Sequence, residues 1–164
     1  MNSALPGLRD RAPHWLERLS TLWPNRVAIT DPDTATEYTY GELRDRAEAA
    51  ARGLARLGVR RGDRVALLME NGVEILDLLF ACGRLGAILV PLNWRLAARE
   101  IADLMRDVEP SLVVAGPEYV DLAQATAPDV PLVTLPADGH AFPADPALSS
   151  EPAPRPDVRM DDPV

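Results

Sequence analysis

Lysine is absent from this chain of 164 residues, and all 17 of its basic residues are arginines. The chain therefore has no P-loop lysine, no Schiff-base lysine and no lysine to neutralise a transferring phosphoryl group. Aspartate and glutamate together number 25, and the net charge is −8. A nucleic-acid partner is not expected, because proteins that bind a phosphate backbone usually present a basic face.

Cysteine and histidine are also scarce. Cys82 is the single cysteine, so an intrachain disulfide is excluded, which suits the reducing cytoplasm where we expect the protein. Cys82 lies in an apolar helical run, which favours a packed core thiol over a nucleophile. His14 and His140 are far apart and have no cysteine or carboxylate at ligand spacing, so no metal site is predicted.

Several motifs that indicate catalysis, nucleotide binding or targeting are missing as well. No glycine-rich phosphate loop of the P-loop or dinucleotide-binding type occurs, and no serine lies in a nucleophile elbow. The N-terminus lacks the features of a secretory signal. The longest apolar stretch, 73–92, contains Glu74, Asp77 and Arg84, which predicts a buried helix and a strand and no membrane span. We therefore assign no catalytic, cofactor-binding or metal-binding residue.

What is present is a regular alternation of strands and helices. After a first helix that ends before Pro24, strands are predicted at 26–30, 37–39, 64–69, 88–90, 112–115 and 132–135. Further helices are predicted after Thr39 and at 73–85, 98–108 and 117–125. In the helix at 98–108, we expect Ile101, Leu104, Met105 and Val108 to face inward. The later strands are continuous apolar runs, as in parallel sheets covered on both faces. The pattern predicts an α/β fold, with a doubly wound, mostly parallel sheet, flanking helices and an N-terminal hairpin.

The helix after Thr39 is the best specified element. Thr39 and Glu42 have the spacing of a capping box, and Tyr38 and Leu43 have that of a hydrophobic staple. Gly58 is placed to end the helix in a left-handed conformation, as in a Schellman motif.

The composition changes at Pro136. Seven prolines, Pro136 included, fall between positions 136 and 164, with little apolar periodicity between them. Such a segment has few side chains to bury and many residues without a backbone donor. We predict an α/β domain at 1–135 and a proline-rich linker or disordered tail at 136–164.

Two loops follow strands at the edge where open α/β sheets bind ligands. The first contains Asn71, which could instead cap the next helix. The second contains Asn93, Trp94 and Arg95, where Trp94 could simply pack on helices and Arg95 pair with a carboxylate. We mark these four residues as lying near a ligand, with the structural alternatives open.

The order of several short runs resembles the N-terminal part of AMP-forming acyl-CoA synthetases, which are class I adenylate-forming enzymes. These runs are Trp23–Ala28, Tyr38–Leu43, Leu57–Ala66, Leu85–Ala87 and Val90–Leu96. The resemblance implies a fatty-acyl or aryl-acyl CoA ligase, which joins an acid to CoA with ATP and Mg²⁺ and releases AMP and pyrophosphate. It also implies that the chain forms part of that family's N-terminal domain.

The chain departs from the family pattern in what it lacks. Gly116 and Gly139 are its only glycines after Val114, so the family's phosphate loop and catalytic lysine have no counterpart. We expect an inactive scaffold, with the missing C-terminal part of the enzyme as partner and self-association through exposed apolar surface. The alternative is a stand-alone, non-catalytic α/β module that binds a partner or ligand.

Overall fold

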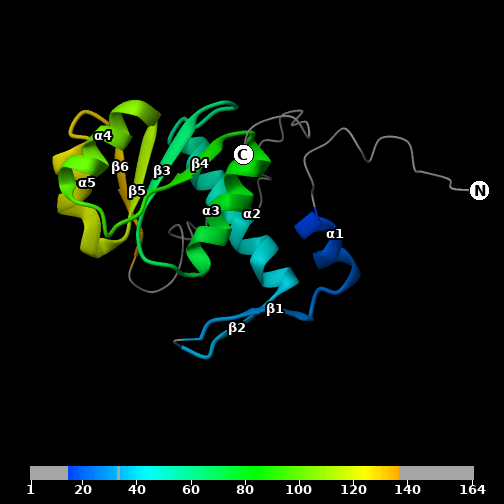
Figure 1. The fold of residues 1–164 in the computed structure, drawn as a ribbon. Coiled ribbons are helices and arrows are strands. Elements are labelled where there is room, and N and C mark those ends of the chain that lie inside the picture. Colours follow the sequence, from blue (N-terminus) through cyan, green and yellow to red (C-terminus); the bar gives the residue numbers. More distant parts are fainter. Residues whose placement is uncertain (1–14, 33, 137–164) are drawn as a thin grey trace, which may run out of the picture.

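A parallel sheet of four strands forms the centre of the molecule (Figure 1). The computed structural model describes residues 15–32 and 34–136, so both histidines and residues 137–164 of the predicted tail lie outside the described part. The strands run in the order β4-β3-β5-β6. Their bounds are β3 Arg64–Leu68, β4 Ile88–Pro91, β5 Leu112–Ala115 and β6 Leu132–Thr134.

Helices cover both faces of this sheet, as predicted (Figure 1). One face packs on α2 (Tyr40–Arg56) and α3 (Val73–Leu85), and the other on α4 (Ala98–Val108) and α5 (Val120–Thr126). Within β3, Leu67 belongs to the first of these cores and Leu68 to the second. Because successive strand residues point to opposite faces, an unbroken apolar run is required.

The remaining elements stand outside the sheet. Helix α1 (Trp15–Leu22) comes first, and β1 (Val27–Thr30) then pairs antiparallel with β2 (Glu37–Thr39) in the predicted hairpin. A short 3₁₀ turn, η1 (Pro117–Tyr119), precedes α5. Within the described ranges, no helix combines the length and the apolar composition needed to cross a membrane.

The direction of winding reverses between β3 and β5. From β3 the chain passes through α3 to β4 on one side, and α4 then carries it back across β3 to β5 on the other. Both pairings of β3 are parallel. The loops after β3 and β5 therefore leave neighbouring strands toward opposite faces of the sheet, which is the arrangement that leaves a crevice.

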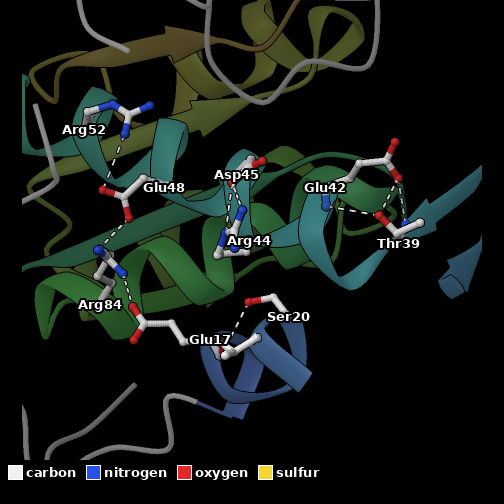
Figure 2. Close-up of polar contacts among 10 residues, drawn as sticks. Glu17, Ser20, Thr39, Glu42, Arg44, Asp45, Glu48, Arg52 and Arg84 are labelled. Atoms are coloured by element: carbon white, nitrogen blue, oxygen red, sulfur yellow. Dashed lines mark hydrogen bonds and ion pairs between the residues drawn. The ribbon is translucent and has the colours of Figure 1, made fainter. Parts of the chain in front are cut away.

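Both ends of α2 have the predicted geometry. The Glu42 N–H donates to Thr39 Oγ1 at 3.2 Å, and the Thr39 N–H donates to Glu42 Oε2 at 2.8 Å (Figure 2). The backbone bond from Thr39 lowers the pKa of Glu42. Gly58 has φ +89°, and the Val59 N–H donates to the Leu54 carbonyl at 3.0 Å, which completes the Schellman motif.

One local prediction was wrong, and one alternative that the sequence left open does not hold. Leu104 was expected to face inward but is 37% exposed. The buried face of α4 is formed by Ile101 and Met105, and Leu104 lies at the margin of that face. Asn71 does not cap α3, since Gly72 takes the N-cap position and makes no side-chain bond there.

Ion pairs join the first three helices. The fully buried Asp77 of α3 accepts two bonds on Oδ2 from Arg46 of α2, at 3.0 Å from Nε and 2.6 Å from Nη2. Arg84 of α3 pairs with Glu48 of α2 at 2.6 Å and with Glu17 of α1 (Figure 2). These contacts fix α1 and α2 on α3.

Candidate functional site

The carboxyl ends of β3 and β5 open into a hollow of about 560 Å³. Residues 69–72, 74 and 116–118 line it after these strands, and Leu135 and Pro136 line it after β6. Four residues of the β1–β2 hairpin contribute a further wall, namely Asp31, Thr34, Thr36 and Tyr38. We call this space the switch-point hollow, because it lies where the winding of the sheet reverses and where open α/β sheets bind ligands.

Carboxylates dominate the charge of the switch-point hollow. Asp31, Glu70, Glu74 and Glu118 line it, and no arginine is among its described lining residues. A negative surface repels the phosphates of ATP and CoA, so these residues do not fit a phosphate site. Among the described residues, no group of three or more histidine, cysteine or carboxylate side chains is arranged to hold a metal ion.

A hydrogen bond joins the two main walls. Tyr119 Oη donates to Glu70 Oε1 at 3.1 Å, which connects the loop after β5 to the loop after β3. Lost hydration raises the pKa of Tyr119, and the bond to the Glu70 carboxylate adds to this effect. The phenol therefore stays protonated at neutral pH and remains a donor to Glu70.

The four residues that the sequence analysis placed near a ligand do not lie together in the structure. Asn71 lines the switch-point hollow, whereas Asn93, Trp94 and Arg95 do not. The Trp94 ring lies 5.6 Å from that of Tyr119, and the Arg95 guanidinium lies 4.0 Å from the centre of the Trp94 ring. Asn93 Oδ1 accepts from the Arg95 N–H at 3.0 Å. The Trp94 ring thus packs against Tyr119. Contact of any of the four residues with a ligand stays a prediction.

Sequence reasoning missed Glu118 and Tyr119. Both follow β5, and the sequence does not reveal that β5 lies beside β3 with β4 on the other side. The signal available was the position of Gly116 directly after an apolar strand, because carboxyl ends of parallel strands share one edge of a sheet.

Cys82 is fully buried, as expected from its apolar surroundings. Burial raises the pKa of its thiol to about 12. The reactive thiolate is therefore almost absent at neutral pH, which excludes Cys82 as a nucleophile in the folded protein.

Comparison with known proteins assigns the fold to a family. The sequence matches the family described as AMP-binding enzyme over residues 16–164. The chain belongs to the AMP-binding enzyme family. The four strands, the flanking helices and the hairpin are those of the family's N-terminal domain, as the sequence motifs predicted.

Curated relatives in the AMP-binding family are CoA ligases. A feruloyl-CoA synthase of Amycolatopsis is 40% identical over 113 residues, which are 69% of this chain and 23% of that protein. A long-chain fatty-acid–CoA ligase of Mycobacterium tuberculosis is 35% identical over 143 residues, covering 84% of this chain and 28% of that protein. The chain thus spans only a minor part of the length of these relatives.

Solved structures of AMP-binding enzymes share the fold. A fatty acyl CoA synthetase of M. tuberculosis is similar with a TM-score of 0.71 and 32% identity, over 87% of this chain and 29% of that one. The N-terminal domain of FACL13 from the same organism has a TM-score of 0.72 and 33% identity, over 87% of this chain and 36% of that one.

Proposed function

We propose that the chain is a scaffold portion of an acyl-CoA ligase, which converts a fatty-acyl or aryl-acyl acid, ATP and CoA to acyl-CoA, AMP and pyrophosphate. The similarity to CoA ligases in both sequence and fold carries the proposal, at 35% identity to the mycobacterial ligase and a TM-score of 0.72 to the FACL13 domain. ATP, Mg²⁺ and CoA act in the complete enzyme, which we place in the cytoplasm.

We propose further that these residues alone do not catalyse the reaction. Adenylate formation needs donors or cations at the phosphates to stabilise the charge of the transition state. The chain has no lysine, and the switch-point hollow is lined by carboxylates. The segments that bind ATP and the acid must then come from another part of the ligase.

The first prediction concerns activity. The purified chain is expected to show no exchange of pyrophosphate into ATP with ferulate or a long-chain fatty acid, because it has no lysine and no recognised phosphate loop to stabilise the transition-state charge. The measurement is radiolabelled pyrophosphate incorporation, with the complete mycobacterial ligase as positive control. Exchange above background would overturn the proposal, provided that an unfolded variant purified in the same way lacks it.

The second prediction concerns the proposed partner and self-association. Leu22, Trp23 and Val27 lie close together in the sequence, before and within the hairpin, and are 54%, 47% and 41% exposed. Exposed apolar side chains in a group indicate an interaction surface. Sedimentation velocity across a concentration series is expected to show self-association that Trp23→Ser weakens.

Leu104→Ser is the matched control for that experiment, because Leu104 is exposed on α4 and lies far from this surface in the sequence. Equal sedimentation of the two variants would contradict the assignment of the surface. A monomer at all concentrations would instead favour the stand-alone binding module.

A further inference from the structure

We propose that Tyr119 is a latch that joins the loops after β3, β4 and β5 at the carboxyl edge of the sheet. In the closed state its hydroxyl holds Glu70 and its ring packs on Trp94, as in this structure. In the open state the bond to Glu70 is broken, and the loop after β3 moves apart from the other two. This conformational device goes beyond the proposed function, because it requires neither ATP nor an acid.

The position of β3 in the sheet makes the latch necessary. Strand β3 lies between β4 and β5, so the loops after β4 and β5 are not neighbours along the sheet. The rings of Trp94 and Tyr119 are nevertheless 5.6 Å apart, and both pack in the same core as Leu68, the last residue of β3. Their contact therefore passes across the end of β3 on the face that α4 and α5 cover. From that face Tyr119 Oη reaches Glu70 at 3.1 Å.

The loop that the latch holds has little else to fix it. Glu70 and Asn71 are exposed, so apolar burial contributes little to their order. Tyr119 is held more firmly, because its ring is half-buried against the core and its N–H donates to the Gly116 carbonyl at 2.9 Å. The bond to Glu70 thus connects a weakly held loop to a firmly held residue.

The loop after β4 supplies the support for the Tyr119 ring. Trp94 packs on this ring, and the Arg95 guanidinium lies 4.0 Å from the centre of the Trp94 ring, where a cation is attracted to the face of an aromatic ring. Asn93 Oδ1 accepts the Arg95 N–H at 3.0 Å, which orders the turn. Trp94 is therefore a positioning residue, which acts on the loop after β3 through Tyr119.

The test is amide hydrogen exchange of the 164-residue chain, measured at Gly116 and Ile75. Their N–H groups donate to the Leu68 and Gly72 carbonyls at 3.0 and 3.3 Å, on the two sides of the latch. Tyr119→Phe removes the hydroxyl and keeps the ring. Exchange at both amides is expected to become faster by roughly threefold to tenfold, which is the factor that one net hydrogen bond provides.

Tyr40→Phe is the matched control, because Tyr40 is a half-buried tyrosine of α2 that does not line the switch-point hollow. It should leave exchange at Gly116 and Ile75 unchanged. The Val59 amide, which belongs to the Schellman motif of α2, serves as the internal reference for global stability. Equal acceleration by the two variants relative to Val59, or no acceleration by Tyr119→Phe, would overturn the latch.

Trp94→Leu tests whether Trp94 acts through Tyr119 or only packs in the core. If it acts through Tyr119, exchange at Ile75 should become faster relative to Val59. The double variant with Tyr119→Phe should then exchange at Ile75 no faster than Tyr119→Phe alone, because both changes break the same connection. Effects that multiply in the double variant would show independent packing and would remove the loop after β4 from the latch.

Discussion

Asp77→Ala is expected to destabilise the domain by about 3–5 kcal/mol, because it leaves the Arg46 guanidinium without its buried partner. Asp77 is fully buried between α2 and α3, and it accepts the Arg46 Nη2–H at 2.6 Å. The Arg46 side chain is only 15% exposed. In the variant, water can therefore replace only some of the hydrogen bonds that the guanidinium makes to the carboxylate. Urea unfolding followed by circular dichroism measures the change in the free energy of unfolding.

Two controls separate this burial effect from the mere loss of an ion pair. Asp103→Ala removes the exposed ion pair with Arg106, and it should lower the free energy of unfolding by less than about 1 kcal/mol. The double variant Arg46→Met, Asp77→Leu should recover much of the stability that Asp77→Ala loses, since apolar side chains can replace a buried pair. Equal losses from Asp77→Ala and Asp103→Ala would show that the buried pair contributes no more than a surface contact.

Leu54→Asp is expected to prevent folding. Leu54 is fully buried in the core shared by α2, α3 and the sheet, and its carbonyl accepts the bond that closes the Schellman motif. A carboxylate at this position would be buried without a partner, and the apolar contacts of the leucine would be lost as well. Together these effects cost several kcal/mol, which is comparable to the whole stability of a domain.

Leu57→Asp is the matched control, because Leu57 lies at the C-cap of the same helix and is 50% exposed. It should change the free energy of unfolding by about 1 kcal/mol or less, chiefly through an unfavourable charge at the helix C-terminus. Thermal unfolding by calorimetry compares the two variants. If Leu54→Asp unfolded cooperatively at the same temperature as the wild type, Leu54 could not be packed in the core as described.

Features determined by neighbouring residues were predictable. The capping box of Thr39 and Glu42 and the left-handed stop at Gly58 need only a few adjacent positions, and the structure has both. The fold class followed from the apolar strands and the alternating helices. A strand that is buried on both faces of a sheet needs a continuous run of apolar residues, and such runs are visible in the sequence. Recognisable family motifs extended this prediction to the N-terminal domain of the CoA ligases.

Features that join distant segments could not be predicted in the same way. Arg46 and Asp77 are 31 residues apart, and nothing in either local sequence selects the other as its partner. The switch-point hollow depends on β5 lying beside β3, so the sequence marked the loop with Asn71 and missed the one with Glu118. The predicted loop at Asn93 lies after β4, an edge strand, and therefore outside the hollow.

The return of the chain across β3 has a consequence during synthesis on the ribosome. β3 can pair with β4 soon after both have emerged, but its other edge remains open until Leu112–Ala115 are made. At translation rates of about 5–20 residues per second, that edge is unpaired for roughly a second or more. An apolar strand with a free edge is prone to aggregate. The nascent chain therefore keeps an aggregation-prone edge on β3 until β5 has been made.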